Sequence, residues 1–510
     1  MMKRIITIAL LSLAALTAGA QVYVATDKSC YLAGERIWCS VFCAQGPSVV
    51  YLELVSADGP AARARIDVRG GRGGGSLQVP VGTPTGNYRL FAYSGPSDVS
   101  SGGPVLSVFN TFSTERVTDG VEIVDAAEYG KPSNAPSGYG LSVQTSDKIV
   151  LENTSGMPVS CCISVTRSDS IIEPGYRSIA RFAPGRARPE SDGEQLRAVI
   201  TGPDASRAAE SNVAALIAVP GARTDCYSAV PSADRTVTFD TENIFGTGDL
   251  VCLLEGLEPN WDCHLELLSP FLAPKAEGLP KLKLCRSMEN DLLRRASAMM
   301  DERAFDTLAT TLPMRREHFM LTHECVSYNL DDYTRFPTME EVFVEITPLV
   351  KLRRPGGKTK IYALAGPVVP SATSHWSEAL VMIDGVPVTD QKLIETYDPA
   401  IVKTVEVYPY RYNMGYRIFD AVVNLVTFKG NMPGVMFDDN VRIYDFQACA
   451  WPEVHEGSET PYWNPLVTLE PGGKMELPVS RLQPGIEYTV IVEGLASGGR
   501  PVYLKKSFVR

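Results

Sequence analysis

After its first twenty residues, the sequence contains no long hydrophobic run. No later segment approaches the roughly 18 apolar residues that a membrane-spanning helix needs. Histidine is scarce, with five in 510 residues, and His318 and His323 are too far apart in sequence for the i, i+4 spacing of a helical zinc motif. The Gly-x-Ser-x-Gly motif of many serine hydrolases is absent. We therefore predict no transmembrane helix, no metal, no cofactor and no recognisable catalytic residues.

Positive charge is also in short supply. The chain has 48 lysines and arginines against 59 aspartates and glutamates, a net charge of −11. We find no basic cluster in an acidic chain of this kind. This argues against nucleic acid and against anionic lipid headgroups as partners.

Residues 1–20 are predicted to be a secretory signal peptide. Lys3 and Arg4 precede an apolar stretch from Ile5 to Leu16, which is too short to span a bilayer. Ala18-Gly19-Ala20 fits a small-residue cleavage site, and an uncleaved anchor is the alternative. Removal of the two basic residues changes the net charge from −11 to −13. We therefore expect an exported protein.

The eleven cysteines all follow the predicted leader, in a compartment where disulfides can form. Because the number is odd, at least one thiol is free or paired between chains. The disulfide candidates are Cys30, Cys39 and Cys43, because a turn over Tyr31–Glu35 could bring Cys30 back beside the next strand. The alternative is that these cysteines are buried reduced thiols that pack as small hydrophobic residues.

Short alternating segments bounded by turn residues predict a mainly β fold, a string of β-sandwich domains of macroglobulin or Ig-like type. Arg36 to Phe42 is one such strand, and Gly70–Gly75 is predicted to be a mobile hairpin loop rather than a phosphate cradle. A helix beginning near Met288 and a capping box at Thr338 interrupt the β pattern. The predicted domains after the leader are β-sandwiches at 21–115, 116–190 and 191–280, a helical connector at 281–334, an α+β domain at 335–434 and a β domain at 435–510.

Two segments of the first domain resemble the macroglobulin-type domain of α2-macroglobulin-like proteins. They are Thr26–Glu35, which matches the family's T-D-K-x-x-Y-x-x-G-E opening, and Gly86–Leu90, which matches its G-x-Y-x-L strand. The reactive thioester of macroglobulin inhibitors needs a Cys-Gly-Glu-Gln run, which this sequence lacks. The resemblance therefore leaves a non-covalent protease inhibitor as one alternative function. The domain at 191–280 faintly resembles carboxypeptidase regulatory-like domains.

Three later runs resemble the plug domain of TonB-dependent outer-membrane receptors. Ile383–Pro387, Val405–Val407 and Val422–Lys429 match the family's I-D-G-V-P turn, its I-E-V strand and its closing strand. The closing motif departs from the family, since Asp420-Ala421 stands where glycines are usual. Only 81 residues follow Lys429, whereas a 22-stranded barrel needs on the order of 200 residues. We therefore predict a plug-like domain without its own transport barrel.

The mature chain as a whole resembles multidomain envelope proteins of Bacteroidetes. That resemblance implies a location in the periplasm, at the outer-membrane periphery or at the cell surface. It allows peripheral association with the outer membrane, and an envelope protein or a glycan as partner. We favour a non-enzymatic binding or scaffold protein, and a secreted hydrolase with an unrecognised site is the alternative from another class.

The segment Tyr408–Tyr416 is the predicted binding surface. It holds several tyrosines and one arginine, a composition enriched at interface hot spots, and Pro409 should end the preceding strand. The alternative is that the tyrosines pack on their own domain. The residues predicted to contact the partner are Tyr410, Arg411, Tyr412 and Tyr416.

Overall fold

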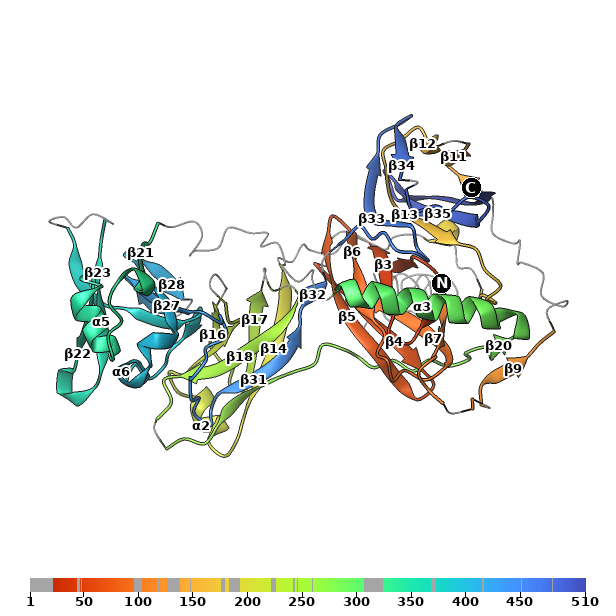
Figure 1. Cartoon of the computed structure of the whole chain (residues 1–510). Helices are drawn as coiled ribbons and strands as arrows, with labels where there is room; N and C mark the ends of the chain where they lie inside the picture. Colours follow the sequence, from red (N-terminus) through yellow and green to blue (C-terminus); the bar gives the residue numbers. More distant parts are fainter. Residues whose placement is uncertain are drawn as a thin grey trace, which may run out of the picture. The chain divides into compact units, whose positions relative to one another are not determined.

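The computed structural model confirms the predicted mainly β fold (Figure 1). It divides into unit 1, formed by residues 1–191, 271–312 and 448–510, and unit 2, formed by 192–270 and 313–447. Residues 1–20 lie outside the part described, so the signal peptide stays a prediction. The described residues are 22–43, 46, 48–95, 103–114, 116–117, 119–125, 138–146, 148–175, 179–182, 193–221, 226–241, 244, 246–258, 260–306, 324–367, 373–414, 417–450, 452–478 and 480–510.

The first sandwich of unit 1 is built on one long strand. β5 (Gly59–Arg69) pairs with β4 in one layer and with β6 in the other, so the two layers share it. Ile37, Leu52 and Leu90 are fully buried between the layers. The strand order is β1 (Tyr23–Thr26), β3 (Arg36–Phe42), β6 (Arg72–Gln78), β5, β4 (Val49–Ser56), β7 (Gly86–Tyr93), β8 (Val105–Phe109), β2 (Cys30–Leu32), and β32 (Cys449–Ala450) pairs with β5.

The glycine run at 70–75 differs from the predicted mobile loop. Gly70 and Gly71 form a tight turn, but Gly73, Gly74 and Gly75 lie buried inside β6. A Cβ atom at Gly74 would stand 2.6 Å from the Cβ of Pro465, which belongs to a strand near the C-terminus. The run is glycine because another strand packs directly on this backbone.

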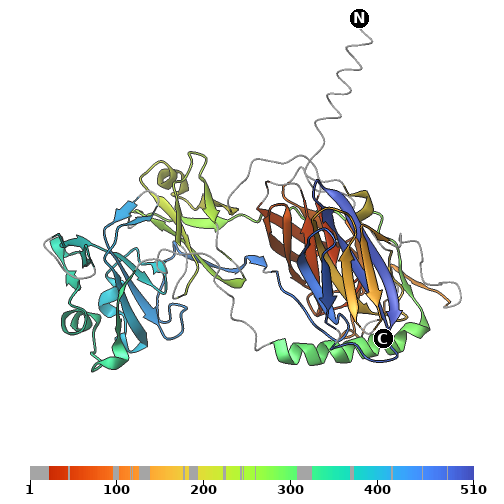
Figure 2. The same ribbon diagram turned by 90° about the horizontal axis from the view of Figure 1, so that it is seen from above.

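The second sandwich of unit 1 combines residues from distant parts of the chain. β13 (Val159–Arg167) pairs with both β33 (Tyr462–Leu469) and β35 (Glu487–Ala496). The prediction of separate domains at 116–190 and 435–510 is therefore wrong, because neither segment has enough strands to bury a core alone. Figure 2 shows these strands side by side. The remaining strands are β10 (Gly138–Tyr139), β11 (Leu141–Thr145), β12 (Ile149–Asn153), β34 (Lys474–Leu477) and β36 (Arg500–Val509).

The predicted connector at 281–334 is not a separate domain. Its first part forms β20 (Leu282–Leu284), which pairs with β9 (Val121–Ile123), and then α3 (Glu289–Asp306). Met288 and Met299 are buried in the same cluster as Cys30 and Leu32, so the helix packs on the first sandwich. The short helices η3 (Ile179–Arg181) and η4 (Arg286–Met288) also lie in unit 1.

Unit 2 begins with a sandwich made mostly of residues 193–267. One layer has the order β17, β14, β19, and the other has the order β16, β15, β18, β31. The last strand comes from beyond residue 440, so this domain does not end at 280 as predicted. The elements are β14 (Glu194–Thr201), α2 (Ala205–Ala209), β15 (Ala214–Ala218), β16 (Cys226–Ala229), β17 (Thr236–Thr241), β18 (Thr247–Glu255), β19 (His264–Leu267) and β31 (Arg442–Gln447).

The rest of unit 2 contains the three strands that resemble a plug domain, adjacent in one sheet. β30 (Val422–Thr427) lies between β27 (Val402–Tyr408) and β25 (Leu380–Ile383), with β21 (Val326–Asn329) and β26 (Val386–Pro387) at the edges. The Thr338 capping box opens α5 (Met339–Glu345) as predicted. Further elements are β22 (Val350–Arg353), β23 (Lys360–Ala365), β24 (His375–Glu378), β28 (Tyr412–Met414), β29 (Arg417–Phe419), α6 (Leu393–Thr396), η5 (Leu330–Asp332), η6 (Pro355–Gly357) and η7 (Pro399–Ile401). Within the described ranges, no helix is long and apolar enough to cross a membrane.

Candidate functional site

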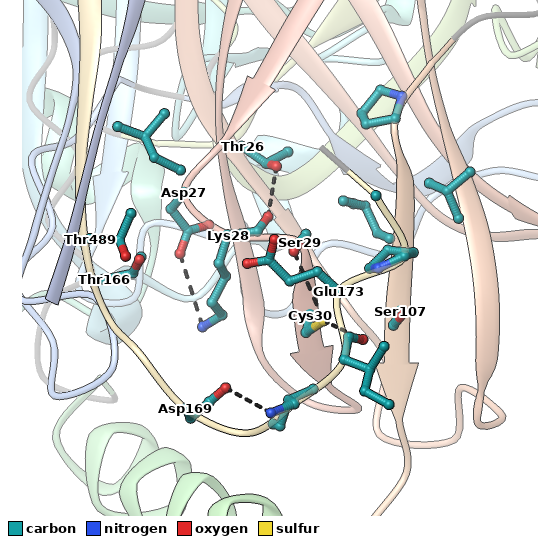
Figure 3. A pocket seen from close by; sticks show the side chains of 18 of the residues that line it. Thr26, Asp27, Lys28, Ser29, Cys30, Ser107, Thr166, Asp169, Glu173 and Thr489 are labelled. Atoms are coloured by element: carbon teal, nitrogen blue, oxygen red, sulfur yellow. Dashed lines mark hydrogen bonds and ion pairs between the residues drawn. The ribbon is translucent and has the colours of Figure 1, made fainter. Parts of the chain in front are cut away.

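Unit 1 contains a cavity of about 920 Å³, a size typical of sites for small ligands (Figure 3). Its walls come from the turn between β1 and β2, the ends of β13 and β35, and α3 with the segment before it. The wall is rich in hydroxyl groups, and Thr489 lies within hydrogen-bond distance of Ser168 (3.2 Å) and of Ser507 (2.9 Å). Charged side chains converge on the cavity, among them Lys28, Asp169, Arg295 and Glu459.

Asp27 fixes the turn that carries Lys28 and Cys30 into the cavity wall. The buried carboxylate accepts hydrogen bonds from the Tyr31 hydroxyl (2.8 Å), the Trp38 backbone N–H (3.1 Å) and the Thr460 hydroxyl (2.8 Å). These are the Asp and Tyr of the macroglobulin-like motif. Their role here is to hold the turn, and the Thr460 bond ties it to the second sandwich.

Lys28 extends from this turn into the cavity, as Figure 3 shows. Its Nζ lies 3.4 Å from Glu35 Oε2 and 3.9 Å from Asp27 Oδ2, both longer than an ordinary N–H···O bond. Burial alone would lower the pKa of the Lys28 ammonium, but the Glu35 and Asp27 carboxylates outweigh it and raise the pKa above its ordinary value. Lys28 is therefore a fixed cation at neutral pH.

The two arginines of α3 tie the helix to both sandwiches. Arg295 Nε lies 2.7 Å from Asp169 Oδ2, and the same guanidinium donates to the backbone carbonyl of Cys30 at 2.8 Å. Arg294 pairs with Glu459 in the second sandwich and lies 3.5 Å from Asp169. These pairs are largely buried, so removal of one partner would leave an uncompensated charge.

The Cys30 thiol faces the cavity but is held in an unreactive form. Its Sγ lies 3.7 Å from the Ile172 carbonyl oxygen. Burial raises the pKa of the Cys30 thiol to about 12, so the thiolate is scarce at neutral pH. Burial likewise raises the pKa of the Cys39 thiol. The cavity therefore offers hydrogen-bond donors, acceptors and charge, and Lys28 and Cys30 both keep their protons at neutral pH.

No disulfide joins the candidates Cys30, Cys39 and Cys43 in this structure. Cys30 lies on β2, in the cluster beneath α3, whereas Cys39 and Cys43 lie in the core of the first sandwich. Cys39 and Cys43 are four residues apart along an extended segment, a span of about 13 Å that a disulfide cannot bridge. The predicted disulfide is corrected to the alternative, in which buried thiols fill the core.

The predicted binding segment, Tyr408–Tyr416, lies in unit 2, whereas the cavity lies in unit 1. After β27 it forms the hairpin β28–β29, and the Arg411 side chain is 73% exposed. Asp420 Oδ1 lies 3.2 Å from Arg411 Nε, and Asp420 Oδ2 lies 3.5 Å from His375 Nε2. Tyr410 and Tyr412 are half-buried, and Tyr412 packs against the unit 2 core. Tyr416 lies outside the described residues.

No site for a metal is formed by the described residues, in that no three His, Cys, Asp or Glu side chains are grouped suitably. His318 and His323 lie outside that part of the chain. The charged cavity was missed in the sequence because its charged residues Lys28, Asp169, Arg295 and Glu459 lie far apart along the chain. Only Asp27, Lys28 and Tyr31 carried a signal, as parts of one motif.

Comparison with known proteins finds solved structures of low similarity. No protein-family model matches the chain, and no curated protein matches it. The α2-macroglobulin of Salmonella reacted with methylamine is 10% identical over 96% of this chain and 39% of its own, with a TM-score of 0.24. The trypsin-activated α2-macroglobulin of Escherichia coli is 9% identical over 96% and 41%, also with a TM-score of 0.24.

A tetra-tandem repeat from a large adhesion protein is 11% identical over 96% of this chain and 99% of its own, with a TM-score of 0.13. The chain spans about two-fifths of the length of the macroglobulins it matches. TM-scores this low support no conclusion about function.

Proposed function

We propose that this protein is a non-enzymatic binding or scaffold protein of the cell envelope that presents its plug-like domain to a protein or glycan partner. The observation that carries the proposal is the exposed guanidinium of Arg411, whose side chain is 73% accessible and whose Nε lies 3.2 Å from Asp420 Oδ1. A thiol acts as a nucleophile when it is a thiolate, and a lysine when it is a free amine. In the cavity of unit 1 the pKa values of Cys30 and Lys28 are both raised, so neither of these two groups is poised for nucleophilic catalysis near neutral pH. Cys285 also lines the cavity, and its pKa is lowered by hydrogen bonding from Ser287.

We assign the partner contact to Arg411 and the neighbouring Tyr410 and Tyr412. Asp420 orients the exposed guanidinium, which lowers the entropy cost of ordering a long side chain on binding. Arginine and tyrosine are enriched at hot spots. Because Tyr412 packs against the core, Arg411 is the cleaner position for a test.

Cross-linking and capture from an envelope extract test this proposal. A photo-cross-linker introduced at Arg411 is expected to capture a discrete partner, and Arg411→Ala to weaken its capture by tenfold or more, about 1.4 kcal/mol. Arg207→Ala is the matched control, because Arg207 is 64% exposed in the same unit and also pairs with one aspartate. Cell fractionation of the same extract tests the location.

Three outcomes would contradict the proposal. Equal capture by the Arg411 and Arg207 variants would show that the contact lies elsewhere. Cleavage of a captured protein or glycan by the purified chain, lost on substitution of Lys28 or Cys30, would favour the hydrolase alternative. Inhibition of a protease without cross-linking through Arg411 would favour the non-covalent inhibitor.

A further inference from the structure

A cationic hairpin in unit 2 corrects the prediction that the chain has no basic cluster. The hairpin consists of β22, η6 and β23. Its five cations lie on the two strands and in the turn between them, and most of them are exposed. They are Lys351, Arg353, Arg354, Lys358 and Lys360.

Strand register places three of these cations on one face. Lys351 pairs with Tyr362, and Arg353 pairs with Lys360, so these four side chains project to the same side of the sheet. Leu364 and Trp376 pair on that same side across β23 and β24. The opposite side carries Val350, Ile361 and Ala363, which are buried in the core with Val342 and Phe343 of α5.

The cations differ in whether a carboxylate neutralises them. Arg354 pairs with Glu340 and Glu395, each at 2.8 Å, and Lys360 pairs with Glu378 at 2.6 Å. No ion pair joins Lys351, Arg353 or Lys358 to a carboxylate of the described residues. Lys351 Nζ lies 3.7 Å from the centre of the Trp376 ring, and the Arg353 guanidinium lies 5.7 Å from that of Tyr362.

The carboxylates of α5 do not cancel this charge. Glu340 is already used by Arg354, and Glu341 closes the capping box with Thr338. Glu345 is exposed on the helix that covers the inner side of the sheet. The outer side therefore keeps a surplus of positive charge in a chain whose net charge is −11.

We propose that the outer side of β22–β24 docks on an anionic phospholipid surface. We call this surface the basic face and define it as Lys351, Arg353, Lys360, Tyr362 and Trp376 of the strands together with the exposed Lys358 of the turn between β22 and β23. Lysine and arginine near an anionic bilayer are attracted to it, and tryptophan and tyrosine favour the headgroup region. Since the rest of the chain is acidic, an anionic surface would attract this face and repel the remainder, which orients the molecule.

A flat array of cations fits a surface of repeating phosphates better than it fits one protein partner. A specific protein interface is organised around a central, well-packed anchor. Here the two rings are half-buried beneath cations rather than presented as an open anchor. An acidic protein is therefore the competing occupant in the test.

Flotation of the full chain with lipid vesicles tests the proposal. The vesicles contain phosphatidylcholine alone or phosphatidylcholine with phosphatidylglycerol, and each is used at low and at high salt. The wild type is expected to bind the anionic vesicles at low salt and to be released by salt, because exposed charges are screened. Each cation contributes roughly fivefold, so Lys351→Glu/Arg353→Glu/Lys358→Glu should lower binding on the order of a hundredfold.

A second triple variant controls for net charge. Lys392→Glu/Lys403→Glu/Lys429→Glu makes the same charge change at exposed lysines of the same unit and should retain most of the binding. Thermal unfolding confirms that both variants fold. The proposal is overturned if the wild type binds both vesicle types equally or neither, if both variants lose binding equally, or if the basic face captures an acidic protein but no vesicles.

Discussion

Thr427 donates its hydroxyl hydrogen to Asp384 Oδ2 over 2.6 Å, although 43 residues separate the two. The same carboxylate accepts hydrogen bonds from the backbone N–H groups of Thr427 (2.7 Å) and Met432 (2.8 Å). Asp384 is fully buried with φ of 47°, a left-handed conformation that aspartate tolerates better than most residues. Asp384 therefore fastens the turn after β25 to the end of β30.

Replacement of Asp384 by alanine should destabilise the five-stranded sheet of unit 2 that contains β25 and β30 by about 3 kcal/mol or more, since three buried donors lose their acceptor. Hydrogen exchange of the β25 and β30 amides measures the change locally. Asp438→Ala, at an exposed position, should have an effect within about ±0.5 kcal/mol. Equal protection in both variants would mean that the carboxylate does not hold the sheet.

Turn residues and apolar runs in the sequence predicted many of the individual strands. They did not predict which strands pair when those strands are far apart in the chain. The Asp384-Gly385 turn and the three strands near it were readable from turn chemistry and apolar runs. The role of the Asp384 side chain was not, because its donors come from a strand 43 residues away. The same limit split one sandwich into two predicted domains, since nothing local links β13 to β35.

The cavity was likewise readable from the sequence only in part. The Thr26–Glu35 motif identified the turn that holds Lys28, but Asp169, Arg295 and Glu459 carry no local pattern that connects them. The basic face was readable in principle. Five cations lie within residues 351–360, and strand alternation would have placed three of them on one side.

Gly74→Ala should weaken the packing of the second sandwich of unit 1 on β6. The new methyl group would stand 2.6 Å and 2.9 Å from two Pro465 carbons and 3.2 Å from Pro452. Overpacking of this kind costs about 1–3 kcal/mol. Calorimetry should show a lower Tm for unit 1. Gly82→Ala is the control, because no atom lies within 4 Å of the position that its new methyl group would take, and a matching loss there would argue against the steric cause.

Cys285 should be alkylated faster than Cys30 in the native protein. Hydrogen bonding from Ser287, whose Oγ lies 3.3 Å from the sulfur, lowers the pKa of the Cys285 thiol, whereas burial raises that of Cys30 to about 12. Iodoacetamide labelling followed by peptide mass spectrometry measures both sites. Ser287→Ala should slow the labelling of Cys285 at neutral pH, because the thiolate fraction falls. The two proteins should converge at alkaline pH, and a difference that persists there would indicate altered access instead.

The stability of unit 1 should fall as the pH drops below about 6.5, the ordinary pKa of histidine. The His455 ring stacks on Trp38 with centroids 4.7 Å apart, and burial lowers the pKa of His455, helped by Lys28 and Arg36 and opposed by Asp27 and Glu302. The folded state therefore binds fewer protons than the unfolded state between the two pKa values. Its stability contribution is present above about 6.5 and is lost as the pH falls toward the folded pKa.

His455→Phe tests this sign, since phenylalanine keeps a ring against Trp38 but does not titrate. Urea unfolding between neutral and mildly acidic pH should show a smaller loss of stability in the variant than in the wild type. Protonation of carboxylates elsewhere in the chain lowers the stability of both proteins in acid. The relevant quantity is therefore the difference between the stability curves of the variant and the wild type. Parallel curves would mean that His455 titrates alike in the folded and unfolded states, and that its burial against Trp38 does not perturb it.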